Sequence, residues 1–197
     1  MWVATQAERR AATTLALRRT ARRLFARRGF EAVSVDTIAA EAGVTRGAFY
    51  HHFESKEALF EVVLDEIETT LAAAVREAAV VHSDPALQLR AGVDRYLDLA
   101  SDRRHSRIVL VDAPAVLGPV RHREVEETHF LGLMRASLAD LLRTATPAEI
   151  ALTARALLAA LCTLAIHAAE QRDDLPVTRT VAHTLLDSIT APKPIRS

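Results

Sequence analysis

Apolar residues recur along this 197-residue chain with the spacing of α-helices, and no run shows sustained alternation of period two. The first predicted helix covers about Ala11 to Arg28 and carries one apolar stripe, formed by Leu17, Ala21, Leu24 and Phe25. Gly29 follows as a C-cap, against which Phe30 is expected to fold back. A short second helix begins after Ser34, whose side chain can cap it, and ends at Gly43.

Caps, prolines and glycines predict seven further helices, which begin near Thr45, Ser55, Asp84, Arg104, Gly118, Thr146 and Val177. Pro114 is expected to end the sixth helix, and Leu175–Pro176 to separate the last two. The stretch TPAE, Thr146 to Glu149, is a capping box with proline in the first helical position. The chain is therefore predicted to be all-α, with about nine helices.

One predicted helix, Ile150 to Ala169, is apolar enough to be compared with a membrane span. Arg155 interrupts it, and the uncharged run that remains is too short to cross a bilayer. We expect a helix buried between neighbours, and no membrane partner. The single Cys162 has no intrachain disulfide partner, and the start MWVATQAERR lacks the apolar run of a signal peptide. A cytoplasmic protein is therefore expected.

The stretch VTRGAFYHHFESKEALF, residues 44 to 60, has a different composition from the aliphatic and charged helices around it. Thr45 can cap its helix, and Phe49 and Phe53 lie one turn apart and are expected to point inward. Two helices joined by a tight glycine turn and braced by a third make a helix-turn-helix unit. Residues 1–60 carry ten Arg or Lys against six Asp or Glu, whereas the whole chain is neutral. This asymmetry indicates an end that faces nucleic acid.

With the two phenylalanines inside, the outer face of the third helix presents Thr45, Arg46, Gly47 and Tyr50. Arg46 can make paired hydrogen bonds to a guanine edge, and the Thr45 methyl group can contact thymine. Gly47 costs about 1 kcal/mol in a helix relative to alanine, which suits a helix that must approach another surface closely.

Three further side chains are placed to hold phosphates, with help from the amides at the start of the fourth helix: Tyr50, His51 and Lys56. The alternative is an ordinary all-α protein in which the glycine turn and the two adjacent histidines are surface features.

Residues 34 to 60, SVDTIAAEAGVTRGAFYHHFESKEALF, resemble the DNA-binding signature of the tetracycline-repressor (TetR) family. The elements IA..AGV, G..Y.HF and SKE.L stand at the family's spacing, and the resemblance covers about residues 11 to 60. It implies an all-α homodimer that binds palindromic operators and usually represses transcription. With Ser34 at the hydroxyl-bearing start of the signature, the positions expected to contact DNA are Ser34, Thr37, Thr45, Arg46, Gly47, Tyr50, His51 and Lys56.

We predict that residues 1–54 form the helix-turn-helix DNA-binding domain and that residues 55–197 form a helical ligand-binding and dimerisation domain. Two reading units must stand about 34–36 Å apart to reach successive major grooves, so a homodimer is expected. The last two helices, Pro147–Gln171 and Val177–Ile189, are the expected interface. Small residues that would allow close approach there are Ala154, Ala159, Ala160 and Ala165. The alternative is that these helices bury their faces within the monomer.

Helices four to eight are expected to surround a cavity for a small-molecule effector, lined by apolar residues with a few polar anchors. The candidate lining residues are Tyr96, Phe130, Met134 and Cys162, and the candidate anchors are Asp112, His129 and His167. A wholly apolar site is the alternative.

His122, Glu126 and His129 share one helix face, as metal ligands can, but no nearby Cys or Asp completes a metal shell. We expect a solvated face there, with no metal and no cofactor. An all-α enzyme based on this face or on Cys162 is the competing class, although aliphatic surroundings would leave the thiol inert. An architectural DNA binder without a ligand is a third alternative, which the large body after residue 80 disfavours. The expected function is a ligand-responsive transcriptional repressor that is not an enzyme.

Overall fold

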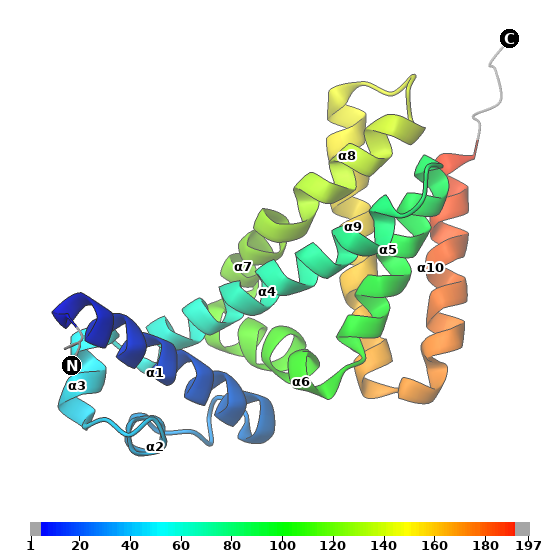
Figure 1. Cartoon of the computed structure of the whole chain (residues 1–197). Coiled ribbons are helices and arrows are strands. Elements are labelled where there is room, and N and C mark those ends of the chain that lie inside the picture. Colours follow the sequence, from blue (N-terminus) through cyan, green and yellow to red (C-terminus); the bar gives the residue numbers. More distant parts are fainter. Residues whose placement is uncertain (1–4, 192–197) are drawn as a thin grey trace, which may run out of the picture.

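Helices and short connections make up the described part of the chain, residues 5–191 of this computed structural model, and no strand occurs within those residues. The predicted all-α class is therefore confirmed. Helices α1 (Gln6–Arg28), α2 (Val35–Glu41) and α3 (Arg46–His52) form a small unit, which we call the head. Helix α4 (Lys56–Val80) runs from the head into a larger group of helices, which we call the body (Figure 1).

Aromatic rings hold the head together. Phe25 of α1, Phe30 of the following loop and Phe60 of α4 contact one another. The ring centroids are 5.6 Å apart for Phe25 and Phe30, 5.5 Å for Phe25 and Phe60, and 5.1 Å for Phe30 and Phe60. Phe49 of α3 is fully buried in the same core, and its ring contacts Phe53. Because Phe60 lies in α4, the core of the head continues past residue 54. The domain division at residues 54 and 55 stays a prediction, and it cuts through a continuous apolar core.

Helix α1 begins at Gln6, five residues earlier than predicted, because a capping box precedes it. The Thr5 hydroxyl accepts from the Glu8 amide, and the Glu8 carboxylate accepts from the Thr5 amide. Its end is as predicted. Gly29 has φ +81°, and its N–H donates to the Phe25 carbonyl.

The middle of the body differs from the prediction, because Pro114 does not end a helix. The elements there follow one another with no loop between them: α6 (Arg103–Ser106), the π-helical η1 (Arg107–Asp112), α7 (Ala113–Glu126), the π-helical η2 (Glu127–Leu131) and α8 (Gly132–Leu141). The Ala113 amide donates to the Ile108 carbonyl, so the helix is widened just before Pro114, where a regular turn would lose a donor and clash with the ring. Gly118, with φ +76° and ψ 162°, is not helical, so α7 consists of two helices that meet at a kink, and the second begins at Gly118–Pro119 as predicted.

The rest of the body follows the prediction except at the start of α10, where Leu175 and Pro176 belong to the helix instead of separating it from α9. Helix α5 (Pro85–Ala100) contacts α4, α9 (Pro147–Glu170) and α10 (Leu175–Thr190), and the 3-10 turn η3 (Arg172–Asp174) joins the last two helices (Figure 1). The capping box of Thr146 and Glu149 forms at the start of α9. Helix α10 begins two residues earlier than predicted, because Pro176 is tolerated in its first turn.

Candidate nucleic-acid interface and ligand cavity

The starts of α2 and α3 present one polar surface on the head. The Ser34 hydroxyl caps α2 by accepting from the Thr37 amide at 3.1 Å, and the Thr45 hydroxyl caps α3 by accepting from the Ala48 amide at 3.1 Å. Thr37 is half-buried, and the exposed members of the predicted DNA-contacting set are Ser34, Thr45, Arg46, Gly47, Tyr50 and His51. These side chains come together because the glycine turn sets α3 against α2.

Arg46 is held in place by two neighbours. Its Nη1 donates to both carboxylate oxygens of Asp36, at 2.9 and 3.2 Å, and its guanidinium lies 5.8 Å from the centroid of the Tyr50 ring. Asp36 is ten residues away on α2 and was not predicted to take part. Because the Arg46–Asp36 ion pair is exposed, it contributes little to the free energy of unfolding. Its main effect is to orient the Arg46 guanidinium.

We expect Arg46→Ala to relax sequence specificity, whereas His51→Ala weakens binding to all sequences alike. A bidentate contact from arginine to guanine discriminates against the wrong base by about 10- to 100-fold, while a phosphate contact carries no sequence information. Fluorescence anisotropy on matched and single-mismatch operators separates the two effects. Equal and sequence-blind losses for both variants would exclude a base contact by Arg46.

Gly47 is not required by packing inside the protein. A Cβ atom built there would meet only the Thr45 hydroxyl oxygen, at 3.9 Å, which is an ordinary contact. Alanine is favoured over glycine within a helix by about 1 kcal/mol, so the fold alone gives no reason for glycine at this position. The absence of a side chain suits a surface that another molecule must approach closely.

Gly47→Ala should therefore raise the free energy of unfolding by about 0.5–1 kcal/mol and weaken DNA binding at the same time. Urea denaturation measures the first effect and operator titration the second. Gly132, a helical glycine of α8 with no atom near its would-be Cβ, is the matched control. Gly132→Ala should stabilise the protein similarly without changing operator affinity. Full operator affinity in Gly47→Ala would show that DNA does not approach α3 there.

Lys56 contacts the protein itself in this structure. Its ammonium donates to the Phe30 and Val33 carbonyl oxygens, at 2.9 and 3.0 Å, and lies 3.9 Å from the centroid of the Phe30 ring. The residue therefore braces the loop between α1 and α2 onto the start of α4. A phosphate contact by Lys56 remains a proposal, and it has to use the third N–H or open one of these bonds.

Asp112 lies at the junction between head and body. The sequence analysis expects it to anchor a ligand in the effector cavity, but it does not line the cavity described below. Its carboxylate accepts from the Phe30 amide at 3.0 Å, so η1 holds the same loop that Lys56 holds from α4. Asp112 and Phe30 are 82 positions apart in the sequence, so local sequence patterns could not predict this contact. The other adjacent histidine, His52, contacts the Thr14 hydroxyl at 2.9 Å and belongs to the packing of α3 on α1.

An apolar cavity of about 170 Å³ lies in the body between α4, α5, η2, α8 and α9. Three of the predicted lining residues, Tyr96, Phe130 and Met134, form part of its wall. Other apolar wall residues are Val75, Leu89, Val93, Leu158 and Leu161, and its polar residues are Arg76, Gln88 and Ser137. The cavity thus borders the end of α4 that is far from the head.

The two other predicted anchors, His129 and His167, do not line this cavity. Neighbouring residues of a helix point to different faces, so a residue next to a wall residue need not face the cavity. His129, beside Phe130, turns to α4 and contacts Asp65 at 3.0 Å. His167 contacts Asp174 at 3.1 Å near the turn between α9 and α10. Cys162 lines a different pocket, between α7 and α9. Its thiol donates to Glu126 at 3.1 Å and faces the Tyr96 hydroxyl at 3.5 Å.

Burial raises the pKa of the Cys162 thiol well above its usual range, and Glu126 adds to this effect. His122 Nε2 lies 3.1 Å from the Val109 carbonyl oxygen and 3.9 Å from the Glu126 carboxylate, so the proposed solvated face is in fact partly buried. The described residues contain no group of three side chains that could hold a metal ion.

The sequence analysis did not identify Glu68, a charged residue of α4 that lies among the apolar residues of its buried face. Its side chain is 1% exposed, and its Oε1 has no hydrogen-bond partner among the described residues. Burial is the largest cause that raises its pKa, and together with the charges of Glu126 and Asp65 it brings the pKa to about 8. The signal was a charged residue at a position of α4 where the apolar period predicts a core residue.

Helix α9 is, by length and composition, the one helix of the described residues that could cross a membrane, a test that core helices also pass. Only 28% of its most apolar window is buried within the chain, so most of that surface has no partner in the monomer. An exposed stripe with helical spacing runs along α9 through Leu152, Ala156, Ala159, Thr163 and Ile166. On α10 the exposed apolar residues are Val177 and Val181. We call these two sets together the α9–α10 face.

The alanines expected at the interface divide into two groups. Ala159 lies on the α9–α10 face and Ala160 is half-buried, but Ala154 and Ala165 are fully buried inside the monomer. The expectation that Ala154 and Ala165 lie in the dimer interface is therefore wrong, because both lie on the side of α9 that packs against its own chain.

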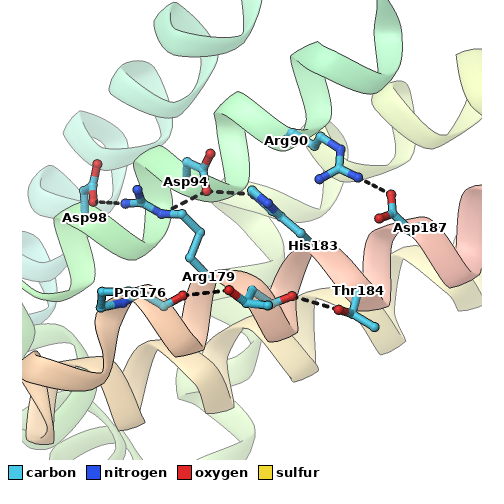
Figure 2. A network of polar contacts seen from close by, with 9 residues as sticks. Arg90, Asp94, Asp98, Pro176, Arg179, His183, Thr184 and Asp187 are labelled. Atoms are coloured by element: carbon cyan, nitrogen blue, oxygen red, sulfur yellow. Dashed lines mark hydrogen bonds and ion pairs between the residues drawn. The ribbon is translucent and has the colours of Figure 1, made fainter.

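Ionic contacts fix the orientation of α10. Figure 2 shows Arg90, Asp94 and Asp98 of α5 meeting side chains of α10. Arg179 pairs with Asp94 at 3.1 Å and with Asp98 at 2.6 Å, and His183 contacts Asp94 at 2.9 Å, while Arg90 pairs with Asp187. These contacts hold one side of α10 against α5 and leave Val177 and Val181 outward.

Comparison with known proteins matches both parts of the chain. Residues 17–63 match the family model of bacterial regulatory proteins, tetR family, and residues 86–189 match that of the tetracyclin repressor-like C-terminal domain. The chain is 27% identical to the transposon Tn10 TetC protein of Escherichia coli over 145 residues, which are 70% of each chain.

One curated relative matches about half of the chain, and one solved structure matches nearly all of it. The HTH-type transcriptional activator FasR of Mycolicibacterium smegmatis is 33% identical over 103 residues, which are 50% of this chain and 47% of FasR. A solved TetR-family transcriptional regulator from Pectobacterium atrosepticum superposes with a TM-score of 0.80 at 28% identity. That likeness covers 97% of this chain and 100% of the other.

Proposed function

Because the chain belongs to the tetR family of bacterial regulatory proteins, whose members are transcriptional regulators and not enzymes, we propose that it is a ligand-responsive repressor. Two copies bind a palindromic operator, each placing α3 in a major groove, and a small molecule in the body cavity releases them. The contacts proposed for the operator are those of the exposed surface around Arg46, Gly47 and Tyr50.

The observation that carries this proposal is the position of α4. Its first residue, Lys56, braces the head, and its last turns, at Val75, Arg76 and Ala79, border the cavity. A helix of 25 residues is about 37 Å long, so a small tilt at the cavity displaces the head appreciably. Asp112 gives the head a second connection to the body.

The α9–α10 face is the proposed dimer interface. Its exposed apolar side chains include Leu152, at 67% exposure, and Val177, at 62%. Packed against its copy about a two-fold axis, this face forms a four-helix contact. A dimer of this kind holds the two heads at the spacing of successive major grooves, about 34 Å.

Mutual linkage between the two ligands tests the proposal. An effector releases DNA only through its different affinity for the two arrangements of the heads, and a coupling of about 5- to 150-fold is typical. Operator DNA must then weaken effector binding by the same factor. Titrating the effector with and without operator measures both directions. A molecule that binds the cavity tightly and leaves operator affinity unchanged would contradict the switch.

A further inference from the structure

A negative charge lies on the surface of the head that is proposed to face DNA. Asp36 is the second residue of α2, and in the sequence it stands between Ser34 and Thr37, two of the positions expected to contact the operator. Its side chain is 61% exposed. Duplex DNA carries about one negative charge per 1.7 Å of its axis, so a carboxylate at this surface opposes binding unless a cation accompanies it.

Arg46 is the cation that accompanies Asp36. Within the described residues, each of the two side chains has this one ion pair. Nη1 of Arg46 donates to both carboxylate oxygens, at 2.9 and 3.2 Å, and Tyr50, one turn further along α3, is the other neighbour of the guanidinium. Asp36 therefore uses only Nη1. The N–H groups of Nε and Nη2 point the same way, so they can donate side by side to O6 and N7 of a guanine edge.

A role in folding explains little of this pair. Exposed ion pairs contribute little to stability, and both side chains are exposed. Asp36 also lies in the first turn of α2, where a negative charge suits the helix dipole, but the Ser34 hydroxyl already caps that turn. A residue that acted only on the stability of α2 would affect the binding of every DNA sequence alike.

We propose that Asp36 is a specificity-determining residue of the DNA-reading surface and that it acts through Arg46. On non-specific DNA, Asp36 cancels the charge of Arg46 and holds the guanidinium away from the phosphates. At the operator, Arg46 donates from Nε and Nη2 to guanine while Nη1 stays on Asp36, so the base contact forms with a guanidinium that is already oriented. Discrimination increases because non-specific binding is weakened and the specific contact is preorganised. This inference rests on the proposed function, in which α3 enters a major groove.

Asp36→Asn removes the charge and keeps the shape of the side chain. Arg46 can then pair with a phosphate, so a non-specific duplex should bind about ten-fold more tightly at low salt, and the slope of log affinity against log salt should steepen by about 0.9. The operator gains the same attraction but loses the oriented base contact, which discriminates by about 10- to 100-fold. The ratio of operator affinity to non-specific affinity should therefore fall by about ten-fold or more.

Fluorescence anisotropy of the full chain tests the inference, with a palindromic duplex from its own promoter region and a scrambled duplex of the same composition, between about 50 and 200 mM salt. Wild type, Asp36→Asn, Arg46→Ala and the double variant form a double-mutant cycle. Without the guanidinium, Asp36→Asn should raise the affinity for both duplexes alike and leave their ratio unchanged. Glu77→Gln removes the same charge from an exposed position of α4 in the body. This control should leave the ratio and the salt slope as in wild type.

Circular dichroism establishes that each variant is folded. An unchanged or increased ratio in Asp36→Asn would overturn the inference, and so would an equal fall of the ratio in the Arg46→Ala background. The wild-type chain tests the proposed function separately. If it binds the two duplexes equally, specific DNA binding fails and the role of Asp36 fails with it. If it prefers the palindrome and Asp36→Asn has the same preference, the proposed function stands and Asp36 has no part in specificity.

Discussion

Ala156→Asp is expected to convert the dimer into monomers and to lower operator affinity by on the order of 10³-fold, to near the non-specific level. Ala156 is exposed within the α9–α10 face, and its neighbours at i±3 and i±4 carry no positive charge. In a two-fold interface the substitution would bury two carboxylates without a cation, which is costly. A single head then reads one half-site, without the second half-site that the dimer holds at the correct distance.

Sedimentation velocity measures the dimer, and fluorescence anisotropy measures the operator affinity. Ala139→Asp, at an exposed alanine of α8, is the matched control and should leave both unchanged. A dimeric Ala156→Asp protein with full operator affinity would place the interface on another surface of the body.

Glu68→Gln is expected to raise the free energy of unfolding at pH 8–9 by on the order of 2–5 kcal/mol and to have little effect near pH 4.5. The folded pKa, about 8, stands above the ordinary value of 4.5, so the folded protein keeps a proton that the unfolded chain releases. The contribution of Glu68 to stability therefore falls as the pH rises through this window. Glutamine carries no such proton, and the difference between the two proteins isolates the effect.

Urea denaturation from pH 5 to pH 9 measures this difference, with the protomer concentration held constant because a dimer's stability depends on it. Glu57→Gln is the control, because Glu57 is an exposed glutamate of the same helix. A difference between wild type and Glu68→Gln that does not change with pH would show that Glu68 is ionised in the folded protein, and that an unrecognised group compensates it.

Local signals predicted the head well, because its boundaries depend on caps and tight turns. Ser34, Thr45 and Ser55 cap the helices that follow them, and Gly29 and Gly43 adopt positive φ values at the ends of the first two. The start of α1 was missed, although Thr5 and Glu8 stand at the spacing of a capping box.

The features that sequence reasoning missed depend on contacts between distant segments. The two bonds of Lys56 to the loop after α1 and the bond of Asp112 to Phe30 join residues 23 to 82 positions apart, for which local periodicity carries no information. The continuous passage through Pro114 depends on the widened turn of η1, whereas the usual effect of proline is to end a helix. For the cavity, composition identified Tyr96, Phe130 and Met134 but could not tell which face of each helix its neighbours occupy.

The measurement that tests the central claim most directly is a titration of the full chain against DNA from its own promoter region, compared with a scrambled duplex of the same composition, at several salt concentrations. We expect two chains to bind one palindrome at least about 10³-fold more tightly than the scrambled duplex, with the logarithm of affinity falling linearly with that of salt concentration. Equal affinity for the two duplexes at every salt concentration would contradict the account.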